Sequence, residues 1–137
     1  MKRKIILSLF CLVLLFATCA VPIGAVDDDY GIMPLWDNTS AINCALTFDK
    51  NDGYAEGFVQ AEFGTSAIKI DVFVYKQIGL KWIYVGQRHV ACTNDLVLGI
   101  SHLFTAEMGM KYKADFTFTV TKDGVDEVIT RTETRAY

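Results

Sequence analysis

The sequence predicts an all-β fold, an antiparallel β-sandwich of about seven strands. From Ser40 onward, apolar and polar residues alternate with a period of two, as expected for strands that turn one face towards a core. Clusters of Gly, Asn, Asp and Lys interrupt the alternation at short intervals, which is typical of tight turns. Short strands at this spacing pack as two sheets, and a small β-barrel is the alternative.

The expected strands follow one another with short links. They cover residues 40–48, 54–62, 68–75, 81–91, 96–104, 112–120 and 125–135. The strand over 68–75 is the clearest, because Ile and Val alternate strictly with Lys, Asp, Phe and Tyr. The strand over 81–91 holds a run of large apolar residues starting at Trp82 and has no polar face, which predicts that both of its faces are covered. An amphipathic helix over 96–110 is the alternative to the fifth strand, although Gly99 disfavours it.

Two of the turns have informative sequences. Asp123 and Gly124 form the dipeptide favoured in two-residue hairpin loops. Residues 49–53 are rich in short oxygen side chains, but their spacing fails the calcium-loop pattern, since the fifth position counted from Asp49 is a glycine and the twelfth is Gln60. We therefore expect a turn there and no metal.

The first 25 residues have the pattern of a signal peptide. Basic residues at positions 2–4 precede an uncharged apolar stretch over 5–17, which is shorter than the roughly 20 residues that span a bilayer. We expect cleavage after Ala25 and a secreted or extracytoplasmic product without a stable membrane anchor. A lipoprotein modified at Cys19 is the alternative, but the residues before this cysteine do not form a lipobox.

The mature chain is expected to contain one domain. Residues 26–39 show no period of either kind, open with three aspartates and contain Pro34, which predicts a flexible N-terminal segment. Met33, Leu35 and Trp36 are expected to pin this segment to the domain by packing. The expected organisation is a signal peptide over 1–25, the flexible segment over 26–39 and a β-sandwich domain over 40–137.

The charge balance argues against nucleic acid as a partner. The full chain has 13 basic and 16 acidic residues, a net charge of −3. Without the three basic residues of the leader, 10 basic residues face 16 acidic ones, a net charge of −6. The basic residues are spread singly among the acids, whereas a protein that neutralises phosphates needs a clustered basic face.

Export also reduces the cysteine count. Cys11 and Cys19 lie in the leader, so the mature domain keeps Cys44 and Cys92. An even pair in an exported protein predicts either one disulfide or two buried thiols. The sequence leaves both alternatives open, because a bridge requires Cα atoms within about 7 Å.

The stretch from Gly109 to Phe116, followed by the hairpin turn at Lys122–Gly124, resembles the penultimate strand of immunoglobulin-like and fibronectin-like sandwiches. The resemblance implies that Tyr112 hydrogen-bonds back across the corner before its strand. The cysteines depart from the immunoglobulin pattern, since Trp82 lies too far after Cys44. The layout of the whole precursor is also similar to small exported proteins of Gram-positive bacteria whose function is unassigned, which implies a bacterial source.

No catalytic constellation is visible in the sequence. His89 and His102 lie on different expected strands, without a carboxylate or cysteine at ligand spacing. Ser101 and His102 are neighbours on a strand, so their side chains point to opposite faces. Cys92 and His89 are separated by an odd number of positions, which also places their side chains on opposite faces. We therefore expect no enzyme activity, no catalytic residue, no metal and no cofactor.

The remaining candidate site is aromatic. Phe73 and Tyr75 share one face of their strand, Trp82 and Tyr84 share one face of the next, and the two strands are expected to pair as a hairpin. If that face is open, it offers an aromatic platform for a sugar ring or a partner protein. The alternative is that these side chains fill the core.

These observations favour a secreted, non-enzymatic interaction or adhesion-like module, with an unknown protein or glycan as its partner and an undetermined oligomeric state. A secreted effector, either an antimicrobial protein or an inhibitor of an extracellular enzyme, is the alternative.

Overall fold

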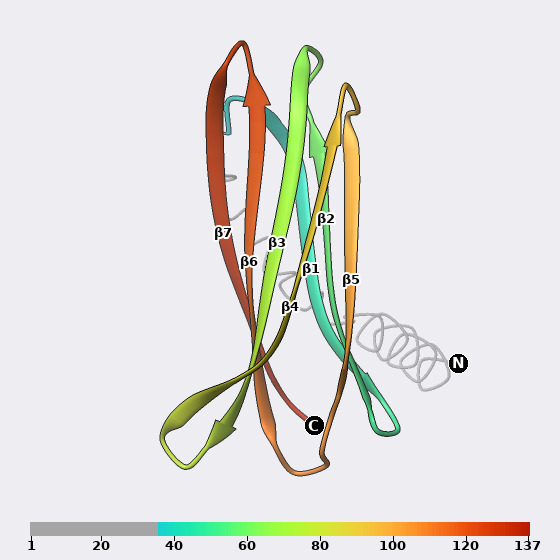
Figure 1. Cartoon of the computed structure of the whole chain (residues 1–137), viewed down its shortest axis with the longest axis vertical. Helices are drawn as coiled ribbons and strands as arrows, with labels where there is room; N and C mark the ends of the chain where they lie inside the picture. The colour runs from blue at the N-terminus through green and yellow to red at the C-terminus, as the bar shows by residue number, and fades with distance from the viewer. Residues whose placement is uncertain (1–35) are drawn as a thin grey trace, which may run out of the picture. The chain divides into compact units, whose positions relative to one another are not determined.

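A computed structural model describes residues 36–137, which form seven antiparallel strands in two facing sheets (Figure 1). The strands are β1 (Thr39–Asp49), β2 (Asp52–Ala61), β3 (Thr65–Ile78), β4 (Lys81–Thr93), β5 (Val97–Thr105), β6 (Lys111–Lys122) and β7 (Val125–Ala136). One sheet has the order β1-β2-β5 and the other has the order β4-β3-β6-β7. The predicted β-sandwich is confirmed, and the fifth strand is a strand rather than a helix. The predicted signal peptide and most of the predicted N-terminal segment lie outside the described residues.

The core lies between the sheets and is built mainly by β3 and β6. On β3 the buried apolar side chains are those of even-numbered residues from Ile68 to Val74, and all of them are fully buried. On β6 the buried set has the same parity and includes Phe116 and Phe118. The rings of these two residues lie nearly parallel, with centroids 6.2 Å apart. The period of two in the sequence therefore corresponds to side chains that point in turn to the core and to the solvent.

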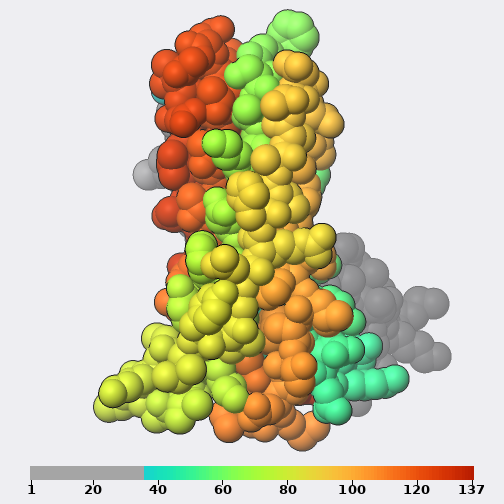
Figure 2. All heavy atoms as spheres, viewed as in Figure 1, coloured from blue at the N-terminus to red at the C-terminus, as the bar shows by residue number. Residues whose placement is uncertain are grey.

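The prediction that both faces of the fourth strand are covered is wrong. β4 has no buried residue and is an edge strand, whose backbone ladder pairs only with β3 among the described strands. Its run of large apolar side chains starting at Trp82 belongs to a hairpin that projects from the domain, and the two faces of the strand are not both covered. Figure 2 shows this hairpin as a yellow-green arm that stands out from the rest of the domain.

Two hairpin turns have the geometry that their residues predict. Asp49 pairs directly with Asp52, so Lys50 and Asn51 form a two-residue loop, and Lys50 has a positive φ of 55°. The expected turn at 49–53 is thus confirmed. In the β6–β7 turn, Asp123 and Gly124 have φ values of 52° and 75°, the left-handed conformation that a tight hairpin with Asp-Gly requires.

The tyrosine contact implied by the sandwich resemblance is present. The backbone N–H of Glu107 donates a hydrogen bond of 2.8 Å to the Tyr112 hydroxyl, which closes the corner before β6. Tyr112 is fully buried, so this bond satisfies a hydroxyl that water cannot reach. The strand order differs from constant immunoglobulin domains, because β4 joins the sheet of β3 rather than that of β5.

The start of the described chain is fixed to the last strand. The Glu127 carboxylate accepts hydrogen bonds from the Asp37 amide and the Thr39 hydroxyl, each of 2.7 Å. Trp36 packs against the core, and the Arg131 guanidinium lies 5.3 Å from its ring centroid. The expected packing role of Trp36 is confirmed. Residues 36–137 contain no helix long and apolar enough to cross a membrane.

Candidate functional site

The four aromatic residues singled out in the sequence lie together on the outer face of the β3–β4 hairpin. Tyr75 pairs with Tyr84 across the two strands, Trp82 pairs with Gln77, and Phe73 pairs with Gln87. The hairpin pairing predicted from the sequence is therefore present. We call these four residues, Phe73, Tyr75, Trp82 and Tyr84, the aromatic strip.

A β-bulge brings the two halves of the aromatic strip to one face. Val74 pairs with Gly86, but the next pair is Tyr75 with Tyr84, which leaves Val85 as an extra residue. Without Val85 in this position, β4 would shift by one residue relative to β3. Trp82 and Tyr84 would then point to the opposite face from Phe73 and Tyr75, since side chains alternate along a strand.

The aromatic strip is open to solvent in part. Tyr84 is 54% exposed and Phe73 is 36% exposed, whereas Tyr75 and Trp82 are half-buried. None of the other described elements packs over this face of the sheet. The alternative that the four rings fill the core is therefore wrong.

The strip is not a flat platform. The rings of Tyr75 and Tyr84 meet nearly edge to face, with centroids 6.1 Å apart. The Lys113 ammonium lies 4.6 Å from the Tyr75 ring centroid and 5.5 Å from that of Trp82, and it is held 2.8 Å from the Asp115 carboxylate. A partner would therefore meet the rings of Tyr84 and Phe73 first, beside a fixed positive charge.

Polar side chains border the strip. His89 Nδ1 lies 2.7 Å from the Asp71 carboxylate, and the two residues face each other across β3 and β4. The sequence did not reveal this pair, because the two residues are 18 positions apart and only the strand register brings them together. Apolar rings with a polar border are typical of surfaces that bind proteins or sugars.

The two cysteines do not form a disulfide. Cys44 lies on β1, beside Glu133 and Arg131 of β7, whereas Cys92 lies on β4, at the other side of the sandwich. Burial, aided by Glu133, raises the pKa of the Cys44 thiol to about 12, and burial also raises the pKa of Cys92. The structure therefore has two free, partly buried thiols and not a disulfide. Neither thiol is an activated nucleophile, because its pKa is raised.

Neither histidine faces the nucleophilic side chain that lies near it in the sequence. His102 faces the interior while Ser101 is exposed, and His89 faces outward while Cys92 faces inward. The expected separation of both pairs across the sheet is confirmed. His102 Nε2 is buried without a hydrogen-bond partner among the described residues. It packs against Gly86 so closely that a β-carbon added to this glycine would lie only 2.8 Å from it.

The partly buried position of His102 predicts that the stability of the domain depends on pH. Burial, and then the charge of Arg88, lowers the pKa of His102. Below about pH 6.5, the ordinary value for histidine, the unfolded chain takes up a proton that the folded chain resists. We expect the wild type to lose stability relative to His102→Phe as the pH falls from 7 through the folded-state pKa, in urea titrations at each pH. A constant difference between the two proteins over that range would contradict this assignment.

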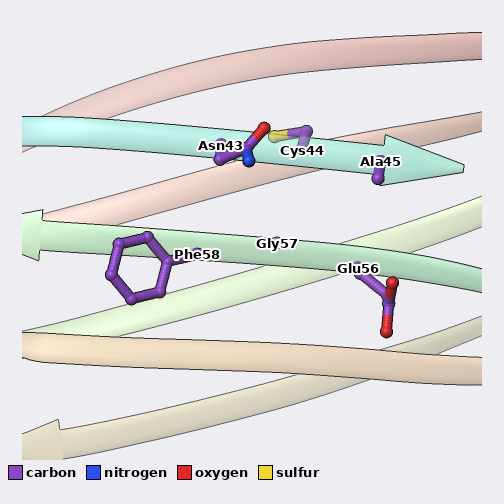
Figure 3. A pocket seen from close by; sticks show the side chains of 6 residues that line it. All are labelled: Asn43, Cys44, Ala45, Glu56, Gly57 and Phe58. Atoms are coloured by element: carbon purple, nitrogen blue, oxygen red, sulfur yellow. The ribbon is translucent and has the colours of Figure 1, made fainter.

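Two hollows on the surface of residues 36–137 do not have the size and lining typical of a small-molecule site. One lies on β1 and β2, on the outer face of the sheet, and is lined by residues that include Asn43, Glu56 and Phe58 (Figure 3); its volume is about 150 Å³. Pockets for small molecules usually measure about 300–1,000 Å³. The other, of about 410 Å³, lies around the β6–β7 turn and is lined mainly by acidic residues, of which Glu127 already binds the start of β1.

Comparisons with known proteins assign no family. No family model matches the chain, and no curated protein matches it. Among solved structures, a β-glucuronidase of Parabacteroides merdae aligns with a TM-score of 0.46 and 11% identity, over 72% of this chain and 13% of the enzyme. A protein of Arabidopsis thaliana solved in solution aligns with a TM-score of 0.43 and 9% identity, over 74% of this chain and 82% of its own. The sporulation control protein Spo0M of Bacillus subtilis aligns with a TM-score of 0.40 and 10% identity, over 66% and 46%.

Proposed function

We propose that this chain is a secreted, non-enzymatic interaction module that binds a protein or a glycan through the aromatic strip. The observation that supports this proposal is the outward position of all four rings on an uncovered sheet face. Exposed aromatic side chains cost solubility, and they are enriched among the residues that dominate binding energy. The similarity of the precursor to exported proteins of Gram-positive bacteria belongs to the same proposal.

The polar border is suited to both partner classes. The carboxylates of Asp71 and Asp115 and the amide of Gln87 lie beside Phe73 in the sheet register. Such groups can bind sugar hydroxyls or backbone amides while an aromatic ring covers the apolar part of the partner. Lys113, fixed between Asp115 and the rings, adds a charge that is already oriented.

The test uses a double variant of the exposed rings. Phe73→Ser with Tyr84→Ser is expected to leave the domain folded and to lower the free energy of unfolding by roughly 1 kcal/mol per site, because both side chains lie outside the core and lose only surface contacts such as that of Tyr84 with Tyr75. The same variant is expected to lose binding on a printed glycan array or on a panel of extracellular proteins. Losing a large aromatic anchor typically weakens binding by 2 kcal/mol or more, about thirtyfold.

Val128→Ser is the matched control, because Val128 is an exposed apolar residue on the same outer face but on β7. It should keep both stability and binding. Unfolding of the double variant would show that the rings are structural and would contradict the proposal. Inhibition of neighbouring bacteria or of a secreted hydrolase by the wild type would instead support the effector alternative.

A further inference from the structure

The turn of the β3–β4 hairpin is apolar and solvent-exposed. Leu80 is 98% exposed, Ile78 is 54% exposed and Ile83 is 44% exposed. The last residue of β3 paired to β6 is Lys76, so the chain beyond it is supported only by its own hairpin partner. We call Ile78, Gly79, Leu80 and Lys81 the hairpin tip.

The apolar character of the tip is not a requirement of the fold. Gly79, with φ of 61°, makes the turn, and the side chain of Leu80 does not contribute to the core. Exposed turns usually carry Gly, Asn, Asp or Ser. Met108, which is 82% exposed, lies in the β5–β6 loop at the same end of the domain (Figure 1), and the ion pair of 2.7 Å between Lys76 and Glu107 ties this loop to the hairpin.

The charge around the tip is positive, in contrast to the acidic balance of the chain. Residues 75–84 contain two lysines and no acid. Lys76 is paired with Glu107, whereas Lys81 is exposed and has no ion pair among the described residues. The acids around the β6–β7 turn lie at the other end of the sheet. The 14 residues of β3 separate the two ends, which is about 45 Å and several Debye lengths at physiological salt.

The aromatic residues next to the tip complete a pattern of three zones. Ile78 and Leu80 lie at the end of the hairpin and Lys81 lies beside them. Trp82 and Tyr84 follow one and three residues after Lys81. Trp and Tyr side chains favour the boundary between water and lipid, and lysine binds lipid phosphates while its stem stays in apolar surroundings.

We propose that the hairpin tip docks on the surface of an anionic phospholipid membrane. Leu80 and Ile78 enter the boundary between headgroups and acyl chains, Lys81 lies against the phosphates, and Trp82 rests at headgroup depth. This inference goes beyond the proposed partner binding. It shares Trp82 and Tyr84 with the aromatic strip. It is tested on Ile78, Leu80 and Lys81, which lie outside the strip, so either proposal can fail alone. A positive, apolar tip matches an anionic lipid surface better than a second copy, which would bring two Lys81 side chains together.

The test measures binding of the mature domain to vesicles of phosphatidylglycerol and phosphatidylcholine in equal parts, by cosedimentation. Vesicles of phosphatidylcholine alone serve as the uncharged control. The double variant Ile78→Ser with Leu80→Ser is expected to weaken partition by roughly a hundredfold, because two apolar side chains lose their burial. Lys81→Glu is expected to weaken it roughly tenfold on anionic vesicles only.

Phe63→Ser is the matched control, because Phe63 is 87% exposed but lies in the β2–β3 turn at the opposite end. It should bind vesicles like the wild type. A Trp36→Phe variant leaves Trp82 as the reporter among residues 36–137, and brominated lipid should quench its fluorescence. This second measurement keeps the test valid if the double variant misfolds.

Three results would overturn the proposal: no wild-type binding to anionic vesicles, equal loss of binding in Phe63→Ser, or no quenching of Trp82. Concentration-dependent dimerisation that Ile78→Ser with Leu80→Ser abolishes, without any vesicle binding, would assign the tip to a second copy and would also overturn it.

Discussion

Replacing Phe118 with alanine is expected to lower the free energy of unfolding by about 3–5 kcal/mol. Phe118 is fully buried in the middle of β6, where its backbone pairs with Ile70 on one side and Ile129 on the other. Its ring lies nearly parallel to that of Phe116. The variant loses both the transfer energy of the ring and the packing around the cavity that remains.

Urea denaturation followed by far-ultraviolet circular dichroism measures this loss. Phe63→Ala is the control, because it removes the same atoms from an exposed position and should change stability by less than about 0.5 kcal/mol. Similar losses in the two variants would contradict the location of the core between the sheets.

Gly53→Ala is expected to destabilise the domain by about 1–3 kcal/mol although it adds only one methyl group. A β-carbon at Gly53 would lie 2.3 Å from Cζ of Phe104. The Phe104 ring cannot move aside freely, because Phe48 contacts it edge to face with centroids 6.4 Å apart and Tyr112 lies 5.2 Å away. The chain therefore needs a glycine directly after the β1–β2 turn.

Two further variants separate this steric cause from a general effect of glycine replacement. Gly99→Ala should be nearly neutral, since a β-carbon there meets its nearest atom at an ordinary 3.8 Å. Phe104→Leu should be less damaging in the Gly53→Ala background than in the wild type, because the smaller side chain leaves room for the methyl group. Strict additivity of the two substitutions would contradict the contact.

Local sequence patterns determined most of the fold. The period of two over β3 and β6 identified both the strands and their buried faces, because the centre of a sandwich must separate apolar from polar side chains. Turn residues such as Asp123 and Gly124 located the hairpins, since few residues adopt positive φ without strain. The pattern failed for β4, because an apolar strand looks the same whether its faces are covered or belong to an exposed arm.

The candidate site could be predicted only in part for a similar reason. The sequence showed which aromatic residues share a face within each strand, but the shared face of Tyr75 and Tyr84 depends on the bulge at Val85. A bulge adds one residue without a marked change in composition. The Lys113 ammonium above Tyr75 likewise depends on the pairing of β3 with β6, which joins residues far apart in the sequence. The sequence signal of the exposed hairpin tip is the pair of large apolar residues that flank Gly79.

The outward position of the aromatic strip is the central claim, and hydroxyl-radical footprinting of the free domain tests it most directly. Tyr84 and Phe73 are expected to be oxidised at rates between that of the exposed Phe63 and those of the buried Phe116 and Phe118, which stay protected. Protection of Tyr84 and Phe73 to the same degree as Phe118 would place the strip in the core and contradict the account.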